Sequence, residues 1–369
     1  MYFELISATK VKLNLNKYLL GCHFDIPLIF VDSKLKFMMD YSGGVKWGII
    51  GVGNVCEVKS GPALYKVPNS SLVGVMRRNG ELAKDFADRH GADYWTDNAE
   101  ELIQDPRINA IYIATPPNSH EYYTKLAAQA GKAVYVEKPM ARNSAECQQM
   151  IDICSKSQVT LFVAYYRRYL PLFLHVKNFI DSGFIGEIRF VDVMVHKSLE
   201  PDIVWATKEQ DNWRVNPDVS GGGYFIDLAS HQLDLLDYII GPIKSAAGYT
   251  SNHGKLYPAE DQVLAVFEFE NGVAGKGSWV FNLAENCNEE RTTIYGSEGK
   301  ISFTFFSDFH ILLEIDGEEP QRIDYAMPEH VQQPLIQAIV EDLMGKGKCH
   351  STGESAARTA LIVDQIMNK

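Results

Sequence analysis

The sequence predicts a two-domain α/β protein, in which a doubly wound parallel sheet precedes an α+β domain with an open, mostly antiparallel sheet. Its 369 residues exceed what one hydrophobic core usually supports. Residues 45–165 alternate short apolar runs with amphipathic segments of helical length. After about residue 185 the runs lengthen and alternate polar with apolar positions. We therefore expect a doubly wound domain over 45–165 and an α+β domain over 166–369.

The first domain is expected to pair its strands in parallel, because its apolar runs are rich in Val, Ile and Ala and helices separate them. The runs are "VKWGIIGVG" (45–53), "SLVGVM" (71–76), "NAIYIATPP" (109–117), "AVYVEKP" (133–139) and "VTLFVAYY" (159–166). Helical patterns follow at 54–66, 80–91, 119–132 and 144–157. This alternation favours a sheet covered on both faces.

The second domain is expected to contain long amphipathic strands followed by two helices at about 329–345 and 354–367. The strand-like runs lie at 185–196, 243–251, 261–283, 291–305 and 309–315. "ENG" (270–272) is typical of a hairpin turn between two of them. A broad sheet face that carries Val, Phe and Trp indicates association, so we expect a homodimer or homotetramer formed through this sheet.

Composition excludes several classes of protein. The net charge is −12 and no basic stripe interrupts it, so nucleic acid is not an expected partner. No apolar run approaches the roughly 20 residues that span a bilayer, so no membrane association is expected. The cysteines are scattered without a C-x-x-C pair, which indicates neither a zinc site nor a redox dithiol. Reduced thiols in a cytoplasmic protein are the simpler expectation.

The first 44 residues fit poorly with the rest of the chain. They mix lysines with short apolar runs and have no signal-peptide core. Met38 and Met39 stand just before the first strong strand. We expect residues 1–44 to be a dispensable extension or an artefact of start-site assignment.

A glycine-rich loop ends the first strand, in "GIIGVGNVC" (48–56). Gly51 allows a tight turn, Gly53 allows close approach of a pyrophosphate, and Cys56 occupies the third position, where a small residue is needed. The helix beginning at Asn54 and Val55 offers free N–H groups to phosphate. At a first strand–helix junction this pattern predicts dinucleotide binding on a Rossmann domain.

The second strand ends in Met76, Arg77 and Arg78, where sites for an unphosphorylated ribose usually carry Asp or Glu. Two arginines can bind a 2′-phosphate through charge-assisted hydrogen bonds. NADP is therefore the expected cofactor. NAD with an arginine stacked on adenine, or a solvated rim, are the alternatives.

Charged residues also end the strand "VYVEKP". Ligands of open α/β sheets bind at the carboxyl edge of the strands, where Lys138 can reach a substrate hydroxyl or carbonyl. Glu137 can hold the cofactor ribose or pair with this lysine. Alone, a strand-end Glu-Lys pair is more often a solvated surface feature.

A second polar pair follows three glycines in "SGGGYFIDLASH" (220–231). Asp227 and His231 are four residues apart and share one helical face. Histidine exchanges protons near neutral pH, and Asp227 can fix its tautomer or contact the same substrate hydroxyl. The alternative is a helix-start aspartate beside a structural histidine. No third ligand accompanies the pair, so no metal is expected.

These motifs together resemble the Gfo/Idh/MocA family of NAD(P)-dependent oxidoreductases over residues 45–369. The resemblance rests on the glycine loop, "TPPNSH" (115–120), "EKP" and the GGG-x3-D-x3-H segment. It implies that Lys138, Asp227 and His231 are catalytic. It also implies cofactor contacts by Thr115, Pro116, His120 and Glu137.

Two further segments resemble parts of the family that lie near the active-site cleft. They are "AYYRRY" (164–169), with Tyr165 and Arg167, and the pair Trp213–Arg214. The resemblance implies substrate contact for these four residues. Interdomain packing or loop anchoring are the alternatives.

The resemblance implies hydride transfer between NADP(H) or NAD(H) and a secondary alcohol or ketone of a sugar, polyol or cyclic diol. Lys138 or His231 is then the general base. Two rival hypotheses are redox-assisted glycoside cleavage, which returns the cofactor unchanged, and an NADP-sensing protein without catalysis. Net cofactor turnover distinguishes them from a dehydrogenase.

Overall fold

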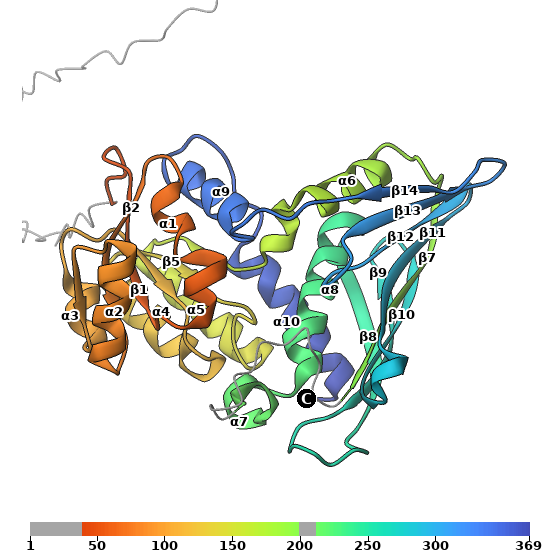
Figure 1. Cartoon of the computed structure of the whole chain (residues 1–369), viewed down its shortest axis with the longest axis horizontal. Coiled ribbons are helices and arrows are strands. Elements are labelled where there is room, and N and C mark those ends of the chain that lie inside the picture. Colours follow the sequence, from red (N-terminus) through yellow and green to blue (C-terminus); the bar gives the residue numbers. More distant parts are fainter. Residues whose placement is uncertain (1–38, 199–211) are drawn as a thin grey trace, which may run out of the picture. The chain divides into compact units, whose positions relative to one another are not determined.

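A computed structural model describes residues 39–198 and 212–369, so most of the predicted 1–44 extension lies outside the described residues. The N-terminal sheet has six strands in the order β3-β2-β1-β4-β5-β6, and every pairing is parallel (Figure 1). The strands are β1 (Val45–Ile50), β2 (Ser70–Met76), β3 (Tyr94–Thr96), β4 (Ala110–Ile113), β5 (Ala133–Val136) and β6 (Leu161–Val163). This order is that of a dinucleotide-binding fold, and it confirms the predicted doubly wound sheet.

Helices connect these strands and cover the sheet. They are the π-helical η1 (Cys56–Ser60), α1 (Ala63–Lys66), α2 (Gly80–His90), α3 (Ala99–Gln104), the 3₁₀ turn η2 (Pro117–Ser119), α4 (His120–Gln129) and α5 (Ser144–Ser157). Along β4, Ala110 and Tyr112 belong to one apolar core, whereas Ile111 and Ile113 belong to the other. The strand is therefore buried on both faces, which explains its uninterrupted apolar sequence.

The second sheet has eight strands in the order β14-β13-β12-β11-β7-β10-β9-β8. They are β7 (Ile188–Ser198), β8 (Ile243–Ser251), β9 (Gln262–Phe269), β10 (Ala274–Leu283), β11 (Glu289–Gly296), β12 (Gly299–Phe303), β13 (His310–Ile315) and β14 (Gln321–Asp324), with the 3₁₀ turn η5 (Glu285–Cys287) between β10 and β11. Only the β7–β10 pairing is parallel within the described sheet. The predicted open, mostly antiparallel sheet is thus confirmed.

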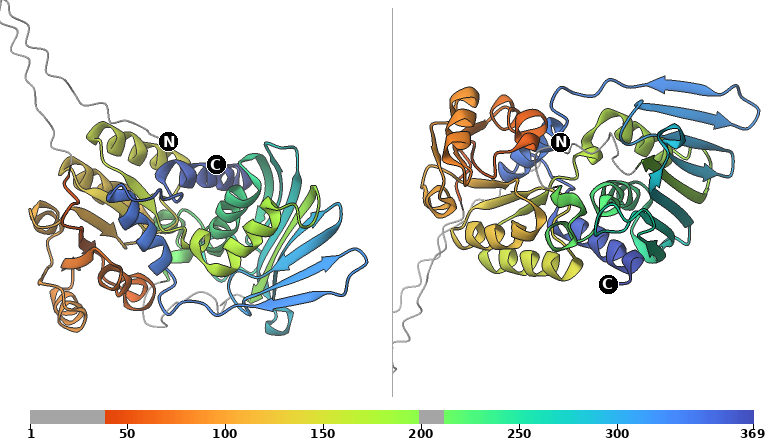
Figure 2. Two further views of the ribbon diagram at one scale, coloured as in Figure 1. Left: turned by 90° about the horizontal axis from the view of Figure 1, so that it is seen from above. Right: turned by 60° about the horizontal axis from the view of Figure 1, so that its bottom comes forward.

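Helices lie between the two sheets (Figures 1 and 2). They include α6 (Pro171–Asp181), α8 (Tyr224–Ile240), α9 (Gln333–Leu343) and α10 (Gly353–Met367), with the short η3 (Tyr166–Tyr169), η4 (Trp213–Val215) and α7 (Pro217–Ser220). The eight-stranded sheet also exposes charged and apolar side chains, among them Lys244, Glu268, Leu264 and Val266. Along β9 buried positions alternate with exposed ones, although its sequence QVLAVFEF is almost continuously apolar, so that Leu264 and Val266 are exposed.

The C-terminal helix α10 contacts both domains. It packs on α5 of the first domain and on α8 and β8 of the second. Just before it, Thr352 forms an isolated antiparallel bridge with Phe162 of β6, and Val163 donates its N–H to the Ser351 carbonyl at 3.0 Å. The last 20 residues therefore complete the outer edge of the N-terminal sheet.

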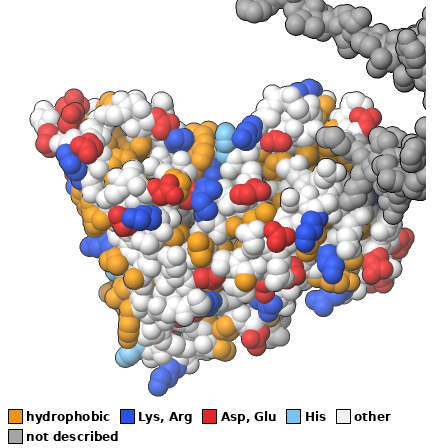
Figure 3. All heavy atoms as spheres, turned by 180° about the vertical axis from the view of Figure 1, so that it is seen from behind, with side chains coloured by type: hydrophobic (Ala, Val, Ile, Leu, Met, Phe, Trp, Pro, Cys, Tyr) orange, Lys and Arg blue, Asp and Glu red, His pale blue; other side chains and the backbone are white. Residues whose placement is uncertain are grey.

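The surface carries charges of both signs. Figure 3 shows one face, on which acidic and basic side chains are interspersed and no continuous basic stripe is present. Among the helices of residues 39–198 and 212–369, none is long and apolar enough to cross a bilayer.

Candidate active site

The loop after β1 has the backbone that a phosphate-binding loop requires. Gly51 has φ +92°, and a Cβ there would lie 2.6 Å from Cγ2 of Thr115. A Cβ at Gly53 would meet only the Gly51 carbonyl at 3.9 Å, so there is open space beside this residue. Asn54 is exposed and Val55 half-buried at the start of the helical segment. The loop therefore fits a dinucleotide pyrophosphate.

Cys56 fills the third position of the loop. Its side chain is fully buried, with Sγ 3.9 Å from the Gly51 carbonyl. Burial raises the pKa of this thiol to about 12, so it is protonated at neutral pH. Cysteine here acts as a small, uncharged packing residue.

The loop after β4 is fixed by His120. This buried imidazole has one ring nitrogen 2.7 Å from the Thr115 carbonyl and the other 3.0 Å from the Met140 carbonyl. Burial lowers the pKa of His120. Ser119 donates from Oγ to Thr115 Oγ1 at 2.7 Å. His120 thus ties the loops after β4 and β5 together and holds Thr115 and Pro116 at the sheet edge.

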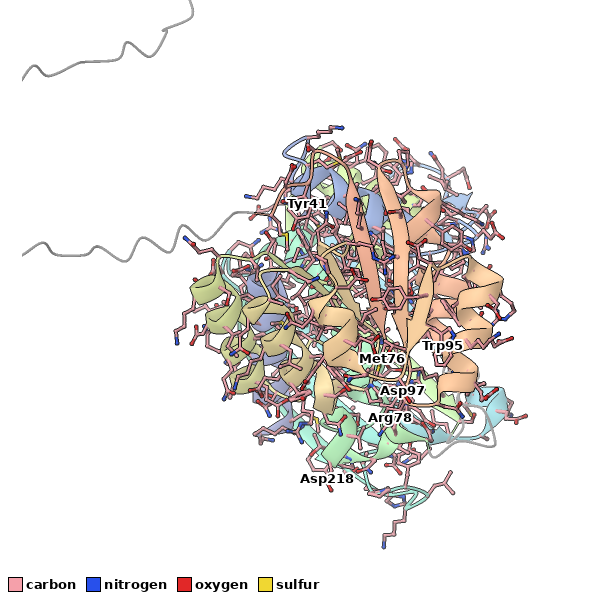
Figure 4. All side chains as sticks on the ribbon, turned by 90° about the vertical axis from the view of Figure 1, so that its left-hand side faces the viewer. Tyr41, Met76, Arg78, Trp95, Asp97 and Asp218 are labelled. Atoms are coloured by element: carbon pink, nitrogen blue, oxygen red, sulfur yellow. The ribbon has the colours of Figure 1, made fainter. Side chains whose placement is uncertain are left out.

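The two predicted phosphate-reading arginines differ in their surroundings. Arg77 donates from Nη1 to the Val52 carbonyl of the glycine loop at 3.0 Å, whereas Arg78 is exposed. Figure 4 shows Arg78 at the carboxyl edge of the sheet together with Asp97, the residue after β3. The edge that would receive the ribose therefore presents charges of both signs.

Lys138 and Asp227 form the central ion pair of the site. Lys138 donates from Nζ to Asp227 Oδ1 at 2.6 Å and to the Asp227 carbonyl at 2.9 Å. Arg214 Nε lies 3.4 Å from Oδ2, with its guanidinium 4.5 Å from the Trp213 ring. Burial alone would raise the pKa of Asp227, but Lys138 and Arg214 outweigh it and hold that pKa at about 2. The carboxylate is ionised at neutral pH.

The glycines before α8 bring Asp227 to Lys138. Gly221 has φ +87°, and a Cβ there would collide with the Arg142 carbonyl, a few residues after Lys138. Gly223 donates its N–H to Glu260 Oε1 at 2.7 Å. The close backbone approach is therefore to the loop after β5.

His231 follows Asp227 by about one turn on α8. It is 4% exposed, and its Nδ1 has no hydrogen-bond partner among the described residues. Burial, and then the positive charges of Lys138, Arg167 and Lys59, lower the pKa of His231 well below its ordinary value. Asp227 does not make the expected hydrogen bond to this nitrogen, because its carboxylate accepts a hydrogen bond from Lys138 instead. His231 is a neutral imidazole at neutral pH.

Two tyrosines of the segment "AYYRRY" lie against this imidazole. Their ring centroids are 6.0 Å (Tyr165) and 5.2 Å (Tyr166) from that of His231. Burial raises the pKa of Tyr165 well above its ordinary value. Burial also acts to raise the pKa of Tyr166, but Arg167, Lys59 and Lys138 outweigh it and lower that pKa. Of the two tyrosines, Tyr166 is thus the one whose pKa the positive charges of the site lower.

Glu137 faces the protein interior. Its Oε1 accepts hydrogen bonds from Tyr112 and Gln332, both at 2.6 Å, and its Oε2 accepts from the backbone N–H of Lys138 at 3.2 Å. It is not paired with the Lys138 ammonium group. The following Lys138–Pro139 peptide bond is cis. Glu137 joins β4, β5 and the segment before α9, and thereby fixes the backbone from which Lys138 projects.

The structure therefore brings Lys138, Asp227, His231, Arg167 and Arg214 together. Sequence reasoning missed Lys59 and Tyr166. Their signals were weak, because Lys59 stands beyond the glycine motif and Tyr166 beside a residue already selected. It also missed Asp97, which follows the overlooked strand β3. Within the described ranges no group of three His, Cys, Asp or Glu residues is placed to hold a metal ion.

Comparison with known proteins identifies the class. Residues 45–165 match the GFO/IDH/MocA "Oxidoreductase family, NAD-binding Rossmann fold", and residues 173–302 match a GFO/IDH/MocA C-terminal domain. "Oxidoreductase P35" of Formosa agariphila is 41% identical over 88% of this chain and 97% of its own length. The chain belongs to the GFO/IDH/MocA family of oxidoreductases, which confirms the predicted family and enzyme class.

More distant relatives have named activities. The scyllo-inositol 2-dehydrogenase (NAD⁺) of Bacillus subtilis is 26% identical over 73% of this chain and 76% of its own. The structure of levoglucosan dehydrogenase in complex with NADH and levoglucosan superposes with a TM-score of 0.75, at 23% identity, over 88% of this chain and 96% of that one. The latter likeness establishes the shared fold.

Proposed function

We propose that this NAD(P)-dependent oxidoreductase transfers hydride to or from a secondary alcohol or ketone of a sugar, polyol or cyclic diol. Relatives named for levoglucosan and scyllo-inositol support this substrate class. The observation that carries the proposal is the joining of Lys138, Asp227 and His231 at the carboxyl edge of the parallel sheet. The bound nicotinamide would supply or accept the hydride at its C4.

Residues of the protein must accept the proton of the substrate hydroxyl. An alcohol that loses hydride from carbon must also lose the proton of its hydroxyl. Because His231 is neutral and its Nδ1 has no partner among the described residues, we propose that it accepts this proton. Lys138 uses two donors on Asp227, and its third can stabilise the developing alkoxide. Asp227 positions the ammonium group for that task.

We propose that the cofactor is NADP(H). Arg78 is exposed at the end of β2, and Arg77 lies against the glycine loop, so both can contact a 2′-phosphate. Asp97 at the same edge favours the rival assignment to NAD(H), because a carboxylate accepts from a ribose 2′-hydroxyl and repels a phosphate.

The first test is a fluorescence titration with NADPH and NADH, followed by a search for substrates among sugars, polyols and cyclic diols. We expect tighter binding of NADPH, and a loss of that preference in Arg78→Ala with unchanged NADH affinity. If the protein binds NADH more tightly than NADPH, and Asp97→Ala improves the binding of NADPH, the NADP assignment is contradicted. The dehydrogenase proposal is unaffected by that result. Failure of both cofactors to turn over with every alcohol and ketone would contradict the dehydrogenase itself.

We also propose a homo-oligomer built on the outer face of the eight-stranded sheet. Tyr249, Leu264 and Val266 are 63%, 48% and 61% exposed on neighbouring strands. Light scattering should give a multiple of the chain mass, and Val266→Glu should reduce it. A wild-type monomer would contradict the proposal. Cytoplasmic location stays a prediction, checked by fractionation.

A further inference from the structure

Arg167 is a buried cation with aromatic neighbours and no ion-pair partner among the described residues. It is 7% exposed, and its guanidinium carbon lies 4.8 Å from the ring centroid of Phe306 and 5.2 Å from that of Tyr166. The rings of Phe305 and Phe173 follow at 5.8 and 5.9 Å. Its Nε is buried without a hydrogen-bond partner, and no ion pair joins it to another described residue.

The adjacent Arg168 shows how this chain treats a structural buried arginine. Arg168 donates from Nε and Nη2 to the two carboxylate oxygens of Asp234, both at 2.7 Å, and from Nη1 to the His350 carbonyl at 2.9 Å. A buried charge without such partners is costly. Cation–π contacts offset only part of that cost. Arg167 is therefore a site that a ligand could complete.

Glu290, an acidic group close to Arg167, is hydrogen-bonded to other residues. Glu290 accepts the backbone N–H groups of Phe305 at 2.5 Å and Phe306 at 3.1 Å. It forms no ion pair with Arg167, although the two are close enough for Arg167 to oppose the rise in the pKa of Glu290 that burial causes. Glu290 thus shapes the loop after β12 and leaves the guanidinium donors of Arg167 available.

Arg167 belongs to the wall of the candidate active site. Tyr166 and Phe306, which flank it, lie 5.2 and 6.4 Å from the His231 ring. Lys59 and Lys138 add positive charge around this ring, and Asp227 is already bound by Lys138. The positive charge near His231 therefore exceeds the negative charge that the described residues supply.

We propose that the sugar or polyol substrate carries a carboxylate and that Arg167 binds it. This inference rests on the proposed dehydrogenase function and names its substrate class. A planar guanidinium matches a carboxylate with two parallel hydrogen bonds. Phe173, Phe305 and Phe306 around Arg167 belong to the second domain, whereas the phosphate loop belongs to the first. The substrate is therefore the expected source of the negative charge.

The test compares matched pairs of neutral sugar and sugar acid, such as glucose with glucuronate and galactose with galacturonate, at saturating oxidised cofactor. We expect kcat/KM to be about 10- to 100-fold higher for the acid in at least one pair, the range of a charge-assisted hydrogen bond. Arg167→Gln should lower kcat/KM at least about tenfold more for the acid than for the neutral sugar, and Arg167→Lys should restore part of that difference. The matched control is Arg189→Gln, which makes the same substitution at an exposed arginine.

Three results would overturn the inference. The first is a kcat/KM for the neutral sugars that equals or exceeds that for the acids. The second is an equal loss of kcat/KM for both members of a pair in Arg167→Gln. The third is a preference for a sugar sulfate over every sugar acid. If no sugar is oxidised, the proposed function fails, and calorimetry with glucuronate or galacturonate and reduced cofactor decides separately about the anion site. Binding that Arg167→Gln abolishes would support the site, and no binding would refute it.

Discussion

Replacing Lys138 with methionine tests the centre of the proposed mechanism. Methionine keeps an unbranched apolar stem and removes the ammonium group that donates to Asp227 at 2.6 and 2.9 Å. Both side chains are 14% exposed, so solvent replaces the lost partner only in part. The variant should therefore lose a charge interaction and a substrate contact together.

The structure gives separate magnitudes for the two losses. The pKa of Asp227 is about 2 against an ordinary 3.8, which corresponds to a net of roughly 2 kcal/mol after burial, which raises this pKa, is outweighed by Lys138 and Arg214. We expect the free energy of unfolding to fall by about 1 to 2 kcal/mol. Loss of the donor that stabilises the developing alkoxide should lower kcat by about 10²- to 10³-fold, or ~3 to 4 kcal/mol. Catalysis should therefore suffer more than stability.

The assay combines steady-state kinetics, cofactor titration and urea unfolding. Cofactor affinity should stay close to wild type. Because Lys138 lowers the pKa of His231, its removal should shift the acidic limb of the kcat/KM profile to higher pH. Lys84→Met, which breaks an exposed pair with Asp88, is the matched control and should change little. Near-normal turnover in Lys138→Met would refute the assigned role.

Three further outcomes follow from the packing and the charges. Asp234→Ala should destabilise the fold by about 3 to 5 kcal/mol in urea unfolding, because it leaves Arg168 buried without its carboxylate, and an unchanged midpoint would contradict this. Gly51→Ala should abolish cofactor binding in a titration, whereas Gly131→Ala, with a similar positive φ and nothing within 4 Å, should reduce only stability; equal binding by both variants would exclude a role for close contact at the loop. Asp227 has a lowered pKa, so its stabilisation is present above pH 3.8 and lost as the pH falls toward about 2; Asp227→Asn should remove that part of the acid dependence, and identical acid-unfolding curves would count against the ion pair.

The sequence predicted the parts of the fold that have a clear period or a long apolar run. β4 and β5 are buried on both faces, so their residues read as continuous apolar segments between helices. β7 buries one face more deeply than the other, and its sequence alternates accordingly around Val191, Asp192 and Val193. The short strand β3 was missed, because it has three residues, of which one is buried. Asp97 at the cofactor edge was missed with it.

The site was predictable where a motif fixed the backbone and unpredictable where contacts join distant segments. Gly51 and Lys138 could be placed from strand ends alone. The pairing of Asp227 with Lys138 was not predicted, because it depends on how the Gly221 turn meets the loop after β5. Likewise, only the three-dimensional structure shows that Arg167 has no ion-pair partner within residues 39–198 and 212–369.

The bridge between β6 and the segment before α10 has a consequence for how the chain is synthesised. Two hydrogen bonds between Val163 and Ser351, beside the Phe162–Thr352 bridge, close the edge of a sheet whose strands were translated long before Ser351. When all six strands of the N-terminal sheet have been translated, β6 is still an unpaired edge strand. We therefore expect the edge strand of the cofactor domain to gain its last partner only after the second domain has been translated. Protease cleavage ahead of Ser351 should loosen the nucleotide-binding half, although the cut lies far from it in sequence.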